Sequence, residues 1–204
     1  TALDVVGTVS GTFDSSNNKV VLVFAASGGD CGGSGCAIVG TVSGTSISFG
    51  TVVEFDDGGG VWSGEVTFDS NSNKVVIAYA DDDDSDKGRA IVGTVSGTSI
   101  SFGSSAVFNA GITRHIAATF DTTNNKVVIA YQDNGNSDYG TAVVGTVSGT
   151  SISFGSEVVF SSATTNEMTQ IAFIPGYGVL IGFGTSGDGK AIYGTVSGTS
   201  ISFD

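Results

Sequence analysis

The chain has 204 residues, of which 20 are Asp or Glu and 7 are Lys or Arg, so its formal charge is −13. This acidic balance, without any cluster of basic residues, excludes the binding of a nucleic-acid backbone or of an anionic membrane surface. No apolar run approaches the ~18 residues of a membrane-spanning helix, so we expect no membrane insertion. The 32 Gly, 13 Phe and single Pro are typical of short strands joined by tight turns.

The sequence is built from a repeat of about 52 residues, a period typical of propeller blades and repeat arrays. Phe-Asp pairs mark three copies and Phe-Ile marks a fourth, at 13–14, 68–69, 120–121 and 173–174. The segment GTVSGTSISFG stands unchanged at 40–50, 93–103 and 145–155, and returns at 194–204 with Asp204 in its last place. Such identity predicts a scaffold hairpin that packs on its neighbour in the same way in every copy. A Thr/Ser array that binds a repetitive surface is the alternative.

The second copy illustrates the strands that we expect in each repeat. A first strand ends at Phe68-Asp69, and a turn leads to KVVIAY at 74–79, a continuous apolar run typical of a strand covered on both faces. A third strand follows within 90–96. Gly97-Thr98 then predict a tight hairpin turn, and the alternation in SISF at 99–102 predicts a half-buried fourth strand.

An aspartate precedes the first turn of three repeats, at Asp14, Asp69 and Asp121. We expect each carboxylate to cap its turn by accepting backbone N–H groups. A functional ring of three carboxylates is the alternative.

Four antiparallel strands per repeat, four times over, predict an all-β fold, a single four-bladed β-propeller domain spanning 1–204. The blades are expected at approximately 7–55, 56–108, 109–160 and 161–204. A strand within residues 1–6, at Leu3–Val6, is expected to complete the last blade and close the ring by the termini. In the competing interpretation this strand pairs with a neighbouring chain, and the protein self-associates through its terminal strands.

The two cysteines, Cys31 and Cys36, stand in DCGGSGC between two predicted strands. The intervening residues are rich in glycine and can curl so that the sulfur atoms meet, which predicts a loop disulfide. A disulfide indicates an oxidising compartment, so we expect an extracellular location or one on a cell or virion surface. Two unrelated free thiols are the alternative.

The strand–turn–strand unit VTFDSNSNKVVIAYADDDDSDKGRAIVGTVSG resembles the blades of bacterial and phage surface propellers. The resemblance covers essentially the whole chain and concerns architecture, without a specific family. QDNGNSDYG at 132–140 resembles the Asp-box turn of sialidase-type propellers in Asp133 and Gly135, but Tyr139 falls one residue late. Sialidase activity also needs a cluster of arginines, and this chain has only Arg89 and Arg114, so the resemblance implies no such activity.

The variable positions just before the Phe-Asp strands carry the candidate binding site. Equivalent places hold Gly7-Thr8, Trp62-Ser63, Arg114-His115 and Glu167-Met168. In a propeller these places converge near the central axis, where Trp62, Arg114, His115 and Glu167 would bind a glycan through ring stacking and polar contacts. The alternative is that Trp62 plugs a narrow channel and Arg114 pairs with Glu167.

An acidic loop, ADDDDSDKG, suggests a second site. Asp82, Asp84 and Asp86 alternate like the first ligands of a calcium loop, and Ca²⁺ prefers oxygen ligands. The glycine and the distal glutamate of such loops are missing, and a solvated acidic loop is the favoured alternative.

Together these features predict a non-enzymatic extracellular recognition module that binds glycans or another surface ligand, with no cofactor other than a possible Ca²⁺. The alternative is a structural subunit of a fibre, appendage or phage tail that assembles by strand exchange. A weaker alternative is a glycoside-cleaving enzyme that uses Glu65 or Glu167, because two carboxyl groups from different blades can meet.

Overall fold

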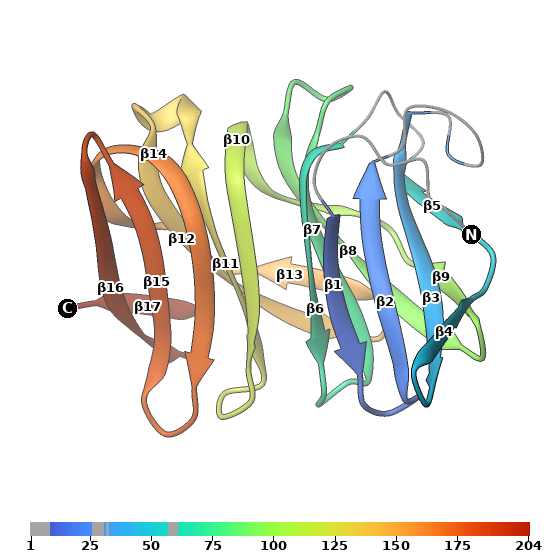
Figure 1. Ribbon diagram of the computed structural model, residues 1–204. Helices are drawn as coiled ribbons and strands as arrows, with labels where there is room; N and C mark the ends of the chain where they lie inside the picture. Colours follow the sequence, from blue (N-terminus) through green and yellow to red (C-terminus); the bar gives the residue numbers. More distant parts are fainter. Residues whose placement is uncertain (1–8, 26–30, 32, 57–60) are drawn as a thin grey trace.

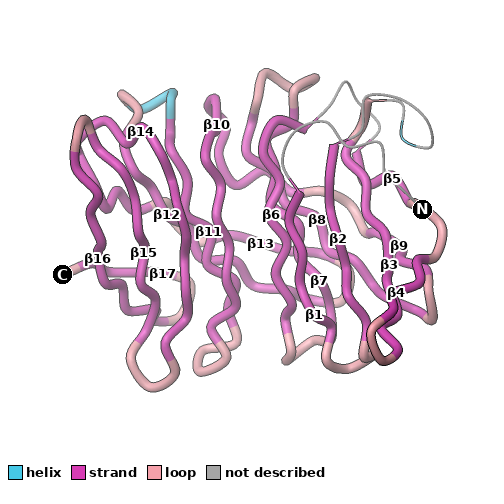
Figure 2. The backbone as a smooth tube through the Cα atoms, in the orientation of Figure 1, coloured by secondary structure: helices cyan, strands magenta, loops and turns pink. Residues whose placement is uncertain are grey.

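The computed structural model describes residues 9–25, 31, 33–56 and 61–204, apart from the side chains at 62, 63 and 166–169. These residues form an all-β protein with antiparallel strands (Figure 2). The described part contains no α-helix, and a short 3₁₀ segment, η2 (Asn134–Asn136), lies between two strands. The all-β prediction is therefore confirmed.

The strands form four consecutive units, which we call sheets 1 to 4. Sheet 1 contains β1 (Val9–Asp14), β2 (Lys19–Ala25), β3 (Gly35–Ser43), β4 (Ser46–Phe49) and β5 (Val53–Asp56). Sheet 2 contains β6 (Val61–Asp69), β7 (Lys74–Asp81), β8 (Lys87–Ser96), β9 (Ser99–Phe102) and the start of β10 (Ala106–Asp121). Sheet 3 contains the rest of β10, β11 (Lys126–Asp133), β12 (Tyr139–Ser148), β13 (Ser151–Phe154) and the start of β14 (Val158–Ile174). Sheet 4 contains the rest of β14, β15 (Gly178–Thr185), β16 (Asp188–Ser197) and β17 (Ser200–Phe203).

Each sheet is an antiparallel meander, and in sheets 1 to 3 the third strand has two short partners. In sheet 2, β9 pairs with one end of β8 (Thr94↔Ser101), and the start of β10 pairs with the other end (Val107↔Arg89). Because β10 and β14 each continue into the following sheet, the expected blade boundaries at 108/109 and 160/161 fall inside a strand.

Local sequence explains the strands and turns. The KVVIAY run is buried on both faces, as predicted, and in β9 Ile100 is buried between exposed serines. The hairpin turn begins at Gly97 with φ of 62°, the left-handed conformation that glycine adopts without strain. Asp121 accepts N–H groups from Thr123 and Asn124 at 2.8 and 3.0 Å, and Asp14 and Asp69 do the same in their repeats, so the predicted turn caps are confirmed.

The four sheets stack face to face in a row, with sheet 1 at the right and sheet 4 at the left of Figure 1. One hydrophobic cluster joins sheets 1 and 2, a second joins sheets 2 and 3, and a third joins sheets 3 and 4. Among the described residues no such cluster joins sheets 4 and 1, and Leu180 of sheet 4 is 40% exposed where Val76 and Val128 of sheets 2 and 3 are fully buried.

The predicted ring closed by the termini is therefore not confirmed, because the two end sheets lie at opposite ends of the row (Figure 1). The strand expected to close it, residues 1–6, lies outside the described part of the chain.

An inserted phenylalanine marks each interface between sheets. The last strand of one sheet places its Phe between a ring on the second strand of the next sheet and a ring on its SISF strand. Phe108, for example, lies 5.1 Å from Tyr131 and 5.8 Å from Phe154 between ring centroids. Phe55 and Phe160 repeat the arrangement at the other two interfaces. These edge-to-face and tilted ring contacts add to the energy of burial and fix how the sheets stack.

A glycine–threonine contact locks each interface at the repeated hairpins. A Cβ atom on Gly50, Gly103 or Gly155 would lie 1.8–1.9 Å from the carbonyl oxygen of the Gly-Thr turn of the next sheet. Only glycine permits this approach, and this is a physical reason for the identity of the repeated segment. In sheet 4 the same place holds Asp204, whose N–H donates to the Tyr193 carbonyl as those of the three glycines donate to their valines.

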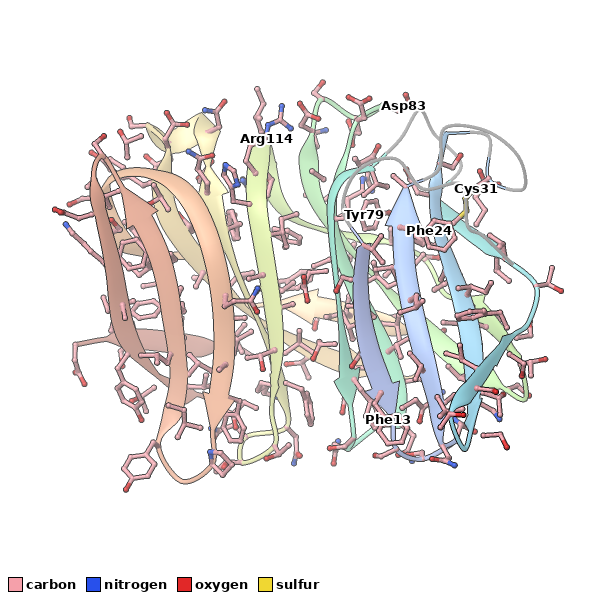
Figure 3. All side chains as sticks on the ribbon, viewed as in Figure 1. Phe13, Phe24, Cys31, Tyr79, Asp83 and Arg114 are labelled. Carbon is pink, nitrogen blue, oxygen red and sulfur yellow. A yellow bond between two sulfur atoms is a disulfide. The ribbon has the colours of Figure 1, made fainter. Side chains whose placement is uncertain are left out.

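A disulfide joins Cys31 and Cys36 on the outer face of sheet 1 (Figure 3). Both cysteines are buried in one cluster with Phe24 and Ile38, against which Phe49 packs. Phe24 and Phe49 correspond to the two rings that receive an inserted Phe in the other sheets. The disulfide thus occupies, in sheet 1, the place that a preceding sheet would fill with a phenylalanine.

Reduction of this disulfide is expected to lower the free energy of unfolding by about 2 kcal/mol, the chain-entropy value for so short a loop. Urea unfolding with and without a dithiol reductant measures the effect. The variant with both Cys31→Ala and Cys36→Ala should not respond to the reductant. An unchanged midpoint of the wild-type protein upon reduction would contradict the expectation.

Candidate functional site

The variable residues lie at one edge of the row, which we call the loop edge; it is the upper edge in Figure 3, where Asp83 and Arg114 are labelled. The predicted binding residues fall at irregularities in the first strands of sheets 2, 3 and 4. Register shifts occur in β6 between Val61 and Gly64, in β10 between Arg114 and Ala117, and in β14 around Glu167. Strand β6 lies against β10, and β10 lies against β14. The structure therefore brings the backbones of Trp62, Arg114-His115 and Glu167 to three neighbouring β-bulges.

Bulges turn side chains away from the regular alternation of a strand and are frequent beside functional sites. The side chains of Trp62 and Glu167 lie outside the described part of the structure, as does the backbone of Gly7-Thr8. Whether these groups meet a ligand, plug a channel or form a pair with Arg114 therefore stays a prediction.

His115 is exposed and has a φ of 50°. The other described non-glycine residues with positive φ are Asn, Ser or Asp in turns, whereas His115 stands within a strand. Such a conformation costs of order 1–3 kcal/mol and persists where the surroundings impose it. The bulge therefore holds the imidazole outward at an energetic cost.

Ion pairs surround the acidic loop. Arg114 Nη2 lies 2.7 Å from Asp86 Oδ2, and Arg89 Nε lies 2.7 Å from Asp81 Oδ2. Asp84 receives Lys87 Nζ at 2.8 Å and also Arg89, and these hydrogen bonds hold the pKa of Asp84 below its ordinary value.

The ion pairs bear on the predicted calcium ligands Asp82, Asp84 and Asp86. In the structure, Asp84 and Asp86 contact basic side chains. Among the described residues no group of three or more His, Cys, Asp or Glu side chains is arranged to hold a metal ion. The carboxylates of this loop join sheet 2 to the bulge of β10 through Arg114.

Buried hydrogen bonds connect the strands at the same junction. Asn109 Nδ2 donates to Thr113 Oγ1 at 3.0 Å and to Asp133 Oδ1 at 3.3 Å, and its Oδ1 accepts the Gly111 N–H at 2.9 Å. The Thr113 N–H donates to the Asp86 carbonyl at 2.9 Å. These hydrogen bonds support the backbone on one side of the β10 bulge. Sequence reasoning missed them because Asn109, Asp133 and Asp86 are far apart along the chain.

Glu65, a candidate for the weaker enzymatic alternative, lies in β6 next to β1. Partial burial raises the pKa of its carboxyl group, and a hydrogen bond with Ser10 offsets part of the rise. A carboxyl group with a raised pKa binds its proton more tightly in the folded state, so this group lowers stability as the pH rises through its folded pKa.

Glu65→Gln should therefore stabilise the protein near pH 7, by less than about 1 kcal/mol because the group is partly exposed. The difference from wild type should vanish below the ordinary pKa of glutamate, about 4.3, where both states of the wild-type chain are protonated. Urea unfolding at the two pH values measures this. A destabilised variant at neutral pH would show that the charged carboxylate is stabilising instead.

A second surface lies on the outer face of sheet 1, away from the loop edge. Val9, Phe13, Val42 and Ile47 are each 46–54% exposed there, and we call these four residues the open face. Phe13 marks its lower end in Figure 3. Ile47 belongs to the repeated hairpin, and its counterparts Ile100, Ile152 and Ile201 are only 3–5% exposed. The sequence could not reveal this surface, because identical residues are buried in one sheet and exposed in another.

No protein-family model matches the chain, and no curated protein gives a significant match. In the described part of the structure, no helix is both long and apolar enough to cross a membrane.

Proposed function

We propose that the protein is a structural segment of a stacked β assembly, which other sheets of the same repeat extend and which displays variable loops along one edge. The observation that carries the proposal is the exposure of Ile47, 46% against 3–5% for the same residue in the other three copies. Contiguous exposed apolar surface of this kind marks an interaction site. The disulfide supports an assembly in an oxidising compartment, such as an appendage or a cell or virion surface.

We infer that each sheet is a blade of the propeller type, an antiparallel meander with face-to-face neighbours. Blades in such an array interact mainly with their nearest neighbours, so their number is not fixed by the geometry of the four present. A complete ring requires blades in addition to these, because sheets 1 and 4 lie at opposite ends of the row.

A chain in which residues 68–119 are repeated once tests this proposal. The insertion joins Thr119 to a second Phe68, so the strand and turn pattern continues without a break. In an extendable array the fifth sheet should raise the free energy of unfolding by a few kcal/mol, because full burial of each large apolar side chain is worth about 1.5–3 kcal/mol. The same chain with Gly103→Asp in the first copy should lose most of that gain.

The outcome that would overturn the proposal is a five-sheet chain less stable than the wild type. That result is expected if the four sheets form a closed unit, because a closed unit cannot admit another blade. Guanidinium unfolding, followed by circular dichroism in the far ultraviolet, measures the difference.

A second candidate function is recognition of a glycan or another surface ligand at the loop edge. It is supported by the three neighbouring bulges and by the unfavourable backbone conformation of His115, which is typical of functional sites. Here the display of variable loops would be the purpose of the array.

A glycan array with the wild-type protein and with His115→Gly tests this candidate. Glycine relieves the positive φ, so the variant should be more stable by about 1 kcal/mol and should lose binding. Trp62→Ala should lose binding without the gain in stability. Equal binding by wild type and His115→Gly, or no binding by the wild type, would exclude the imidazole from such a role.

A further inference from the structure

The face of sheet 1 that is open has three equivalents in the same chain, on sheets 2, 3 and 4, and each of these is covered by the preceding sheet. The hairpins of sheets 2, 3 and 4 present the same residues, Val and Ile of GTVSGTSISF, to the preceding sheet. In each case the preceding sheet approaches through the glycine that ends its own hairpin. The internal interfaces therefore show what kind of surface covers this face.

From this we propose that the open face of sheet 1 binds a blade of the same repeat that ends in Ser-Phe-Gly, and that Asp204 prevents the fourth sheet of this chain from binding there. The inference rests on the proposed function and states which kind of blade extends the array at sheet 1. Under this inference a second copy of the same chain does not bind to the open face through its fourth sheet.

Steric exclusion at residue 204 is the first argument. Asp204 has the backbone place of Gly155, where a Cβ would lie 1.8 Å from the Thr199 carbonyl oxygen. If sheet 4 of one chain stacked on sheet 1 of another in the same geometry, the Asp204 side chain would meet the carbonyl of Thr45 in the same way. The carboxylate would also bring negative charge against the carbonyl oxygen.

Tyr193 adds a second obstacle on the same face of sheet 4. It pairs with Leu180 as Val92 pairs with Val76 in sheet 2. Val39, Val92 and Val144 occupy this place in the first three sheets, and each packs into the cluster shared with the following sheet. A tyrosine there is too large for the same contact, since overfilling a packed interface is destabilising.

The disulfide defines one further feature of the partner. Cys31 and Cys36 already pack on Phe24 and Phe49, where the other interfaces take an inserted phenylalanine. The partner blade therefore needs a small residue, or none, at the place of Phe108. Its contact is made with the lower half of sheet 1, where Phe13 and Ile47 are exposed.

A donor and an acceptor chain test the proposal. The acceptor is the wild-type protein, whose open face is intact. The donor carries Asp204→Gly and Tyr193→Val, which free its fourth sheet, and Ile47→Glu, which disables its own open face. Sedimentation velocity of an equimolar mixture should show a complex of about twice the 20.3 kDa mass of one chain, while each chain alone stays monomeric.

The matched control is a donor with Asp204→Ala in place of Asp204→Gly. It lacks the charge but retains the Cβ, so it should bind the acceptor at least about tenfold more weakly. Equal binding by the two donors, or head-to-tail self-association of the wild type that Ile47→Glu abolishes, would overturn the role of Asp204.

A folded glycine donor that does not bind would overturn the partner itself. If the triple variant does not fold, the double variant Asp204→Gly with Tyr193→Val replaces it: this chain keeps its open face and should self-associate, and a monomer would overturn the proposal. The five-sheet chain distinguishes failure of this inference from failure of the proposed function. It can be stabilised through its internal interfaces even when the open face binds nothing.

Discussion

Gly103→Ala should unfold at a much lower denaturant concentration than the wild type, with a loss of about 3 kcal/mol or more. The new Cβ would lie 1.9 Å from the carbonyl oxygen of Thr150, and the two nearest atoms are backbone, which cannot rotate away as a side chain can. The turn of sheet 3 must therefore shift, and with it the interface that the hairpin covers. Equilibrium unfolding in urea measures the loss.

Gly189→Ala is the matched control for Gly103→Ala. Gly189 also lies in a strand, but a Cβ there meets no atom within 4 Å. The substitution should change the free energy of unfolding by less than about 0.5 kcal/mol. If Gly103→Ala were as mild as this control, the glycine–threonine contact would not be the reason for the glycine at this place in the first three repeats.

Phe108→Ala should cost about 3–5 kcal/mol, the usual range for a buried phenylalanine. The ring is inserted between Tyr131 and Phe154, and Gly88 of β8 leaves room beneath it, where a Cβ would lie 2.4 Å from the ring. Its removal leaves a cavity between sheets 2 and 3, which the strands cannot close without breaking their hydrogen bonds.

Phe13→Ala provides the comparison, because Phe13 is 53% exposed on the open face. We expect a loss of at most about 1 kcal/mol for this truncation in the isolated chain. Denaturant unfolding of both variants under one condition gives the contrast. A loss for Phe13→Ala as large as that for Phe108→Ala would mean that the open face is covered in solution.

Local structure was predictable because it depends on short-range patterns. The apolar run at 74–79 can be buried on both faces only as a strand between two neighbours, and Gly97-Thr98 permits a two-residue turn. The Asp121 cap likewise needs only the two residues that follow it in the turn. These predictions required no knowledge of how the sheets stack.

Whether the sheets form a closed ring was not predictable. The repeated hairpin has the same sequence in every sheet, so it does not indicate which copies are covered by an adjacent sheet. Ile47 and Ile100 have identical neighbours in sequence and opposite environments. The one local signal was the change from glycine to Asp204 in the last copy. Its meaning depends on the contact of Gly103 with Thr150 in the adjacent sheet, which joins residues 47 positions apart and appears only in three dimensions.

The repeat predicts where the candidate binding residues lie along the backbone, but it does not determine their side-chain contacts. Equivalent places in the repeats do fall at neighbouring bulges, since the repeat forces equivalent backbone positions. Among the described side chains Arg114 forms an ion pair with Asp86, which the acidic loop supplies from the preceding sheet. Side-chain pairing of this kind depends on how two sheets meet, and periodicity alone does not determine it.

The measurement that tests the open stack most directly is the rate at which a thiol reagent labels Ile47→Cys and Ile100→Cys. The native cysteines are joined in a disulfide and do not compete. Ile47→Cys should react within about tenfold of an unfolded thiol, whereas Ile100→Cys should be protected at least about 100-fold, because it reacts only when its interface opens. Equal protection of the two thiols at low protein concentration would contradict the account, because it would mean that sheet 1 has a covering neighbour within the chain.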